Sequence, residues 1–361
     1  MNNTINKIQR CDNIVPLQGA KVCYNEHGDD YQGELKANFS SNVWHEADNT
    51  DLYNHLCNLF AKTRRYPETE AESLKMALAE IYCIESSHIS IGNGSIDIIY
   101  RIAQSYRGKK SIIVSPTFSE YSRACEMNEH TIKLCGREDI MVEIDKFQPD
   151  VVWLCNPNNP DGTCFDRKEL QAILYTYPLV TFIIDQSFVD FTMQETMNAN
   201  SVLEFTNLIL IYSLTKRYSI PGLRIGYVIA PKTIIYKLDY FKIPWSVNTL
   251  AIEAGKYIIS RKDNSFDLKT WLTESIRFQK EINRIDIFEA LSSQTPFFLV
   301  KLRKGRAADL KAFLLKEGIL IRDATGFYNN RMQMIRLNTL SINQNNLLID
   351  RLTAWKQTLS L

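Results

Sequence analysis

Hydrophobic residues form short, unbroken runs through the middle of the chain, at residues 111–114, 151–155, 180–184 and 208–212. Continuous rather than alternating hydrophobicity is typical of strands that are covered on both faces, as in a parallel sheet. Stretches with helical spacing separate several of these runs. The repeated strand–helix order predicts an α/β fold with a mostly parallel sheet.

Two helix starts are predicted from polar residues that precede apolar stripes. Thr69 and Glu72 have the spacing of a capping box, and an apolar stripe from Leu74 to Ile81 follows them. Asp166, with Glu169 three residues later, predicts a second start between two strand runs.

The pattern changes after about residue 247. We expect a helix from 266 to about 291, another from 307 to 316, and short strands at 297–300, 319–321 and 334–337. This mixture predicts a small α+β domain. Residues 1–45 are expected to be an N-terminal segment that joins the small domain, 46–246 the large ligand-binding domain, and 247–361 the small C-terminal domain.

Composition narrows the class of protein. A length of 361 residues suggests about two domains, and a net charge of +1 gives no basic surface for nucleic acid or an anionic membrane. No run of 18 apolar residues could span a bilayer, and the first residues lack the apolar stretch of a signal peptide. We therefore expect a cytoplasmic protein. Its eight cysteines and five histidines are dispersed without metal-ligand spacing, so no metal site is expected.

Ligands of a parallel α/β sheet bind at the carboxyl ends of its strands, so the residues after each strand run are candidate site residues. A glycine turn with Gly94 and Ser95 could bring backbone amides to a phosphate. Phe118, Asn159 and Asp185 follow three other strand runs and would supply an aromatic face, an amide and a carboxylate. Taken singly, each is explained at least as well by a turn, a helix cap or core packing.

A lysine beside two hydroxyls follows the fourth run: Ser213, Thr215 and Lys216, with Arg224 eight positions after the lysine. A lysine can form a Schiff base with an aldehyde, and hydroxyls with an arginine can hold a phosphate dianion. Together with the groups at the other strand ends, these residues suit pyridoxal phosphate.

The same motifs occur in the order of a known family: Tyr66-Pro67, Gly92 to Ser95, Pro116-Thr117-Phe118, Asn156 to Pro160, Asp185, Ser213-x-x-Lys216 and Leu223-Arg224-x-Gly226. In them the chain resembles the fold-type-I pyridoxal-phosphate enzymes of the aminotransferase class I/II family, from about Asn38 to Leu337. Two branches are most similar, threonine-phosphate decarboxylase and histidinol-phosphate aminotransferase. The resemblance implies a three-layer large domain that binds the cofactor.

The resemblance also implies a role for each matched residue. Lys216 would form the Schiff base and move protons, Asp185 would pair with the pyridine nitrogen, Asn159 would donate to the phenolic oxygen, and Phe118 would stack on the ring. The cofactor phosphate would be held by residues of the glycine turn and of the lysine segment, namely Gly94, Ser95, Ile96, Ser213, Thr215 and Arg224.

Further residues would bind the substrate or the partner subunit. Tyr66 would reach the cofactor phosphate of the neighbouring subunit, which implies a homodimer. Arg322 and Arg336 would bind an anionic group of a small phosphorylated amino acid or amine. His27 could match an N-terminal His-Gly element that contacts substrate phosphate, although two acids follow His27-Gly28 here.

At one position the chain differs from many members of this family, and the difference bears on the reaction. Phe188 stands where many aminotransferases have a tyrosine that donates to the phenolic oxygen, and threonine-phosphate decarboxylases tend to carry phenylalanine there too. The motifs lean slightly toward decarboxylation, with transamination of histidinol phosphate or another amino acid as the alternative. A non-catalytic regulatory protein that keeps the cofactor fold is a third possibility, disfavoured because no residues remain for a DNA-binding domain.

Overall fold

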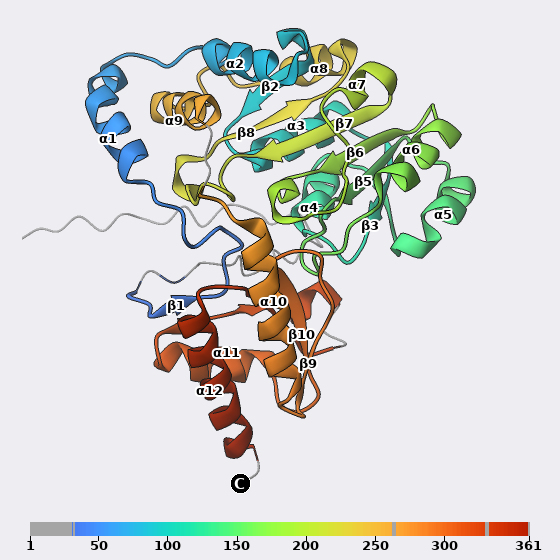
Figure 1. Ribbon diagram of the computed structural model, residues 1–361. Helices are drawn as coiled ribbons and strands as arrows, with labels where there is room; N and C mark the ends of the chain where they lie inside the picture. Colours follow the sequence, from blue (N-terminus) through green and yellow to red (C-terminus); the bar gives the residue numbers. More distant parts are fainter. Residues whose placement is uncertain (1–30, 32, 262–264, 329–331, 360–361) are drawn as a thin grey trace, which may run out of the picture.

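The computed structural model of the chain describes residues 31, 33–261, 265–328 and 332–359. These residues form a large unit, at the top of Figure 1, and a small unit below it. Each unit is built on its own main sheet, with seven and four strands among the described residues.

The strands of the large sheet lie in the order β2-β8-β7-β6-β5-β3-β4. Six of them run parallel, and only β8 runs antiparallel to its neighbours β7 and β2. The predicted α/β class with a mostly parallel sheet is confirmed, and the four hydrophobic runs are β3, β5, β6 and β7. The bounds are Ile89–Gly92 (β2), Lys110–Val114 (β3), Thr131–Cys135 (β4), Val151–Cys155 (β5), Thr181–Asp185 (β6), Leu208–Ser213 (β7) and Gly226–Ile229 (β8).

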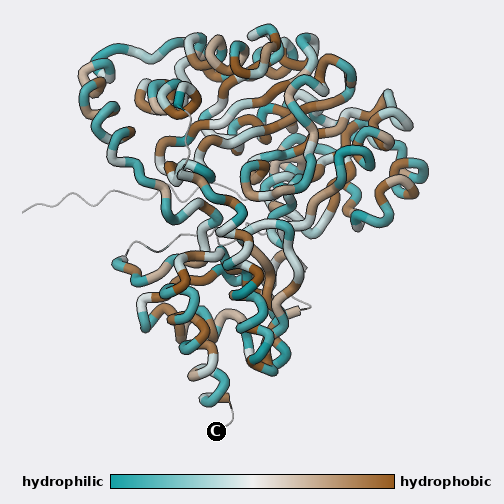
Figure 2. The backbone as a smooth tube through the Cα atoms, viewed as in Figure 1, coloured by the Kyte–Doolittle hydropathy of each residue, from teal (hydrophilic) through white to brown (hydrophobic). Residues whose placement is uncertain are grey.

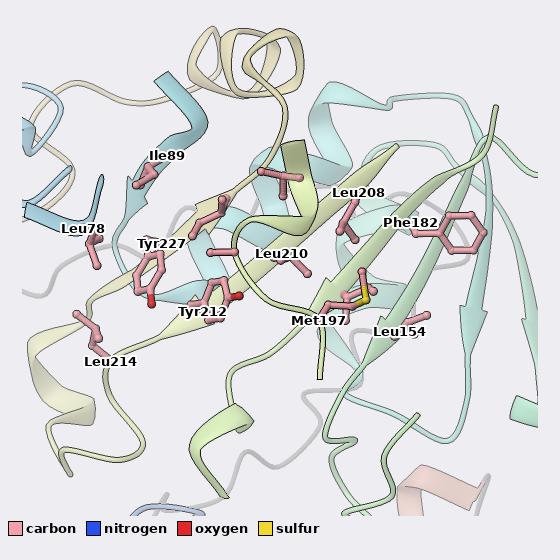
Figure 3. Packing of buried hydrophobic residues seen from close by; sticks show 14 of the residues in the cluster. Leu78, Ile89, Leu154, Phe182, Met197, Leu208, Leu210, Tyr212, Leu214 and Tyr227 are labelled. Carbon is pink, nitrogen blue, oxygen red and sulfur yellow. The ribbon is translucent and has the colours of Figure 1, made fainter. Parts of the chain in front are cut away.

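Helices cover both faces of this sheet, which explains why the strands are apolar throughout. One face packs against α3 (Ser95–Ser105), α4 (Glu120–Met127) and α8 (Lys232–Asp239). The other face packs against α1 (Thr50–Leu59), α2 (Glu72–Tyr82), α5 (Ile140–Phe147), α6 (Arg167–Thr176), α7 (Ser201–Glu204) and α9 (Thr249–Ser260). Figure 2 shows hydrophobic strands inside and hydrophilic stretches on the outer helices, and Figure 3 shows part of the core on the second face.

Of the two predicted helix starts, one is confirmed and one is wrong. Asp166 caps α6, because its carboxylate accepts a hydrogen bond from the Lys168 amide at 2.8 Å. The capping box of Thr69 and Glu72 does not form. Helix α2 begins at Glu72 itself, after Ala71 in a left-handed conformation, and Glu68 accepts from the Ser73 amide at 2.7 Å.

The stripe along α2 is shorter than the sequence suggested. Leu74 and Leu78 are buried, whereas Ile81 near the end of the helix is exposed. Helical spacing identified the buried face but could not show that the last turn extends beyond the core.

The small unit joins residues from both ends of the described chain. Its main sheet has the order β12-β13-β10-β9 and is antiparallel, and β1 pairs in parallel with β11. The N-terminal segment therefore joins this unit as far as it is described. The strands are Ala37–Asn38 (β1), Phe288–Ala290 (β9), Phe297–Leu302 (β10), Ile319–Leu320 (β11), Arg322–Asp323 (β12) and Met334–Asn338 (β13), and the helices are Leu268–Asn283 (α10), Ala307–Lys316 (α11) and Ile342–Thr358 (α12).

Helix α11 has the predicted bounds, but the long helix predicted from 266 to about 291 ends at Asn283. The residues beyond it form β9, whose Phe288 pairs with Leu302 of β10. The tertiary pairing overrides the apolar spacing that had suggested a continuous helix.

Helix α9 lies with the large sheet rather than the small unit. It packs against α2 and α1, and its Ala251, Ile252 and Ile258 belong to the same buried cluster as the large sheet. We therefore propose that the large unit extends through α9, beyond the boundary at 246 that the sequence had suggested. None of the helices among the described residues is long and apolar enough to span a bilayer.

Candidate active site

Three neighbouring strands of the large sheet end in polar residues that face the same side. In β5, β6 and β7, the buried cluster beneath α3 and α4 contains Trp153, Ile183 and Ile211. Because side chains alternate along a strand, Cys155, Asp185 and Ser213, two residues later, face that side too. Cys155 pairs with Asp185 across the sheet, so these groups lie at one edge.

Asp185 is a buried carboxylate, with only 4% of the residue exposed. Tyr121 Oη donates to Asp185 Oδ2 at 2.7 Å, and the Ser187 amide donates to Oδ1 at 2.8 Å. Burial raises the pKa of Asp185, and the two hydrogen bonds and the charge of Lys216 offset that rise only partly. A carboxylate in this position is suited to a further cationic partner.

Tyr121 is a functional candidate to which the sequence analysis assigned no role. The residue follows Phe118 by three positions, so the first turn of α4 brings both aromatic rings together, with centroids 5.7 Å apart. A tyrosine one helical turn after an aromatic strand-end residue was the available signal. It pointed equally well to core packing.

A cradle of two glycines, an arginine and a helix N-terminus forms where β2, β7 and β8 meet the start of α3. Gly94 has a positive φ of 79°, Ser95 opens the helix, and a Cβ atom on Gly94 would collide with the Arg224 guanidinium. On the neighbouring strand, a Cβ on Gly226 would lie 2.6 Å from the Ser95 amide nitrogen. The glycines therefore let an arginine and a helix N-terminus approach each other, which suits an anion.

The hydroxyls predicted for this cradle lie beside it. Ser213 pairs with Gly226 across the sheet, and its Oγ lies 2.8 Å from Thr215 Oγ1. Arg224 is anchored by its Nη1, which donates to the Pro221 carbonyl at 2.8 Å, and burial lowers the pKa of its guanidinium. Ile96, the second residue of α3, packs on the core under the helix.

Lys216 lies in the turn after β7, with its amine beside an apolar wall. Its Nζ lies 5.7 Å from the ring centroid of Phe188, and its carbonyl accepts from the Trp44 amide at 3.0 Å. Phe188 is buried in an aromatic cluster with Trp44, Phe191, Trp271 and Phe297. This cluster joins the large unit, the small unit and the N-terminal segment around the lysine.

Arg336 of β13 reaches from the small unit to the strand ends of the large one. Its Nη1 donates to Asn159 Oδ1 and its Nη2 to the Ser40 carbonyl, both at 2.6 Å, and only 7% of the residue is exposed. Arg322 pairs with Arg336 in register across β12 and β13. Burial, and then the charge of Arg322, lower the pKa of Arg336. Two neighbouring guanidiniums of this kind favour the binding of an anion.

Two of the predicted site residues are not found at this edge of the sheet in the part of the chain that the structure describes. Tyr66 is 83% exposed and packs against Trp245, with ring centroids 5.3 Å apart. His27 lies outside the described residues. Within the described residues, no group of three or more His, Cys, Asp or Glu side chains could hold a metal ion.

The chain matches one family of known proteins over most of its length. The model of the family described as aminotransferase class I and II matches residues 31–352. The chain belongs to the aminotransferase class I and II family. A protein of Caldanaerobacter subterraneus named putative threonine-phosphate decarboxylase is 32% identical over 73% of this chain and 75% of its own length. A histidinol-phosphate aminotransferase of a Thermoanaerobacter species is 31% identical over 72% of this chain and 75% of that protein.

Solved structures of this aminotransferase family agree in fold. The L-threonine-O-3-phosphate decarboxylase of Porphyromonas gingivalis is 38% identical, with a TM-score of 0.85 over 88% of this chain and 99% of that one. The histidinol-phosphate aminotransferase of Clostridium acetobutylicum is 26% identical, with a TM-score of 0.80 over 89% and 99% of the two chains.

The protein is thus an enzyme of the class I and II aminotransferase family, and its cofactor is pyridoxal 5'-phosphate. The described residues fit that group. The glycine cradle with Arg224 has the shape and charge for its phosphate, and the buried Asp185 carboxylate has the chemistry to hold a proton on its ring nitrogen.

Proposed function

We propose that the protein is a decarboxylase of a small phosphorylated amino acid, similar to threonine-phosphate decarboxylase. The 38% identity to the Porphyromonas gingivalis enzyme over most of both chains supports this choice. The buried Arg336, in register with Arg322 and hydrogen-bonded to Asn159, is the structural observation that supports an anionic substrate beside the cofactor site.

Each site residue has one task in this proposal. Bound pyridoxal phosphate supplies an aldehyde carbon that bonds an amine and a protonated ring that accepts an electron pair from a bond broken at Cα. Lys216 would bond the aldehyde carbon in the absence of substrate and would deliver a proton to Cα after carbon dioxide has left. Asp185 would keep a proton on the ring nitrogen, Asn159 would donate its amide N–H to the phenolic oxygen, and Phe118 would cover the ring.

The remaining residues hold the anionic groups. The amides of Ser95 and Ile96 in the turn after Gly94, the hydroxyls of Ser213 and Thr215, and Arg224 hold the cofactor phosphate. Arg336 and Arg322 hold an anionic group of the substrate and so decide which Cα bond stands perpendicular to the ring. The hydrophobic wall at Phe188 excludes water from Lys216 and donates no hydrogen bond to the phenolic oxygen. His27 remains a candidate contact for substrate phosphate.

Histidinol-phosphate aminotransferase is the second candidate, favoured by the 31% identity to the Thermoanaerobacter enzyme. Purified protein would be incubated with threonine phosphate alone, and separately with histidinol phosphate plus 2-oxoglutarate. We expect carbon dioxide release without a keto acid, and none from the Lys216→Ala variant. Glutamate formation instead would select the aminotransferase. A protein that stays colourless after addition of the cofactor would exclude both activities.

We further propose a homodimer in which Tyr66 completes the site of the partner, because its exposed ring lies beside the half-exposed Trp245 on the surface of the protomer. Mixed subunits test this directly. Tyr66→Phe and Lys216→Ala proteins should each be impaired alone, whereas a hybrid dimer contains one site with both native residues. Activity that fails to recover on mixing and subunit exchange would exclude shared sites. The cytoplasmic location stays a prediction from the sequence.

A further inference from the structure

Tyr121 lies at the centre of the candidate site without belonging to any role assigned above. It is the second residue of α4, and only 1% of it is exposed. Its hydroxyl donates to Asp185 Oδ2 at 2.7 Å, from the helix that covers the end of β6. The contact joins residues 64 positions apart in the sequence.

The ring of Tyr121 makes a second set of contacts. It stacks on Trp153 of β5, with centroids 5.8 Å apart and planes 26° apart, and its neighbour Phe118 meets it edge-on at 86°. A stacked neighbour and an edge-on neighbour leave the ring little freedom to move. One rigid side chain therefore touches both the acid and the aromatic residue that face the cofactor.

We propose that Tyr121 is a positioning residue that holds the Asp185 carboxylate through its hydroxyl and Phe118 through its ring, so that both meet the cofactor in a fixed relation. This inference rests on the proposed roles of Asp185 and Phe118. Tyr121 itself would touch neither substrate nor cofactor.

The hydroxyl also affects the charge of Asp185. The groups that face this carboxyl are Tyr121 from α4, Cys155 from β5, Ser187 after β6, and Lys216 after β7. Burial raises the pKa of Asp185, whereas the hydrogen bonds from Ser187 and Tyr121 lower it. Without the hydroxyl the pKa would rise further, and the carboxylate would be lost first at the acid end of the pH range. A neutral acid cannot hold the ring-nitrogen proton as an ion pair.

The test is Tyr121→Phe in the full-length holoenzyme, because this change removes one oxygen and keeps the ring. Bound cofactor would be measured from its visible absorbance after dialysis at about pH 6 and about pH 8. We expect a larger loss at the lower pH. The acid limb of kcat/KM should move upward by about 0.5–1 pH unit, from the usual net strength of one hydrogen bond.

Tyr106→Phe is the matched control. Tyr106 is buried in the same cluster as Tyr121, and its hydroxyl donates to Thr181 Oγ1 at 3.2 Å, away from Asp185. It should retain cofactor as the wild type does at both pH values. A second variant, Tyr121→Leu, also removes the ring and should lower cofactor retention at every pH, because Phe118 loses its support.

The inference would be overturned if the Tyr121→Phe and Tyr106→Phe variants had the same cofactor retention and the same pH profile. Asp185→Asn separates this outcome from failure of the proposed function. If Asp185→Asn loses cofactor or turnover while Tyr121→Phe does not, only the positioning role is wrong. If Asp185→Asn behaves as the wild type, the role assigned to Asp185 is itself wrong, and the inference falls with it.

Discussion

Two arginines mark the two ends of the site, and their surroundings are built differently. Arg224 follows a turn of the large unit, is half-buried, and touches the glycine turn before α3, so everything around it comes from the ends of one sheet. Arg336 is almost fully buried in the small unit, and its two guanidinium bonds reach Asn159 of the large unit and Ser40 of the N-terminal segment.

The difference separates a fixed site from an assembled one. The cradle at Arg224 depends on neighbouring strands whose register is set by backbone hydrogen bonds, so it exists as soon as the large sheet folds. The site at Arg336 exists only when three segments meet. We therefore expect changes at Arg224 to weaken mainly cofactor binding and changes at Arg336 to weaken mainly substrate binding.

The largest effect on kcat/KM is expected from a change at Arg336. Arg336→Met should lower kcat/KM by at least about a hundredfold, because a substrate anion would lose two charge-assisted hydrogen bonds of about 1.5 kcal/mol or more each. Cofactor retention, measured by visible absorbance, should fall much less than kcat/KM, because Arg336 touches the cofactor site only through Asn159. Arg303→Met, at an exposed arginine just after β10, is the control and should change neither value. An equal loss of cofactor from Arg336→Met would mean that the two ends are not independent.

The converse experiment is Arg224→Met. Removal of a charged partner of the cofactor phosphate should weaken cofactor affinity by about ten- to a hundredfold. At saturating cofactor the substrate KM should be unchanged. Titration with cofactor followed by steady-state kinetics measures both quantities. A raised KM with normal cofactor affinity would reverse the assignment of the two arginines.

Gly94→Ala tests whether the cradle depends on the close approach of Arg224. The substitution imposes strain at φ 79° and places a Cβ against the guanidinium, so cofactor affinity should fall by about tenfold. Gly108→Ala is a matched control, since Gly108 has φ 73° and open space around it. Both variants should lose about 1–2 kcal/mol of stability in thermal melts. Only Gly94→Ala should lose cofactor affinity, and an equal loss in both would assign the effect to strain alone.

The smallest expected effect is at Ser213. Ser213→Ala removes one neutral hydroxyl from the cradle and should weaken cofactor binding by roughly two- to tenfold. Thr215, whose hydroxyl lies 2.8 Å away, would keep a donor nearby. Ser105→Ala, at the opposite end of α3 from the cradle, serves as the control for loss of a serine hydroxyl. Cofactor affinity unchanged from this control would place Ser213 outside the phosphate site.

Errors in the sequence-based fold arose where local pattern and tertiary packing disagree. The capping box at Thr69 had the right residues, but Glu68 supplies the carboxylate that binds the amide in the first turn of α2. The helical pattern between 266 and 291 ended early because β10 offers Phe288 a strand partner. The boundary that we propose after α9 could not be read from the sequence, because the chain gives no signal at residue 247 that distinguishes one core from another.

Most of the candidate site could be read from the sequence because it follows strand ends. Asp185, Lys216 and Arg224 lie next to strands or turns whose hydrophobic runs mark where parallel strands end. Tyr121 could not be assigned in this way, since its contact with Asp185 depends on how α4 lies across the sheet. Arg336 was predicted from resemblance alone, and its contacts with Asn159 and Ser40 are a result of tertiary structure.

The sequence by itself therefore determined a mostly parallel sheet, four of its strands and the chemistry that follows them, because continuous hydrophobic runs and the residues after them are local properties. Only the tertiary structure decided which of these groups touch. The burial that shifts the pKa of Asp185, the arginine from the small unit that reaches Asn159, and the tyrosine that holds the acid all depend on the packing of segments far apart in the chain.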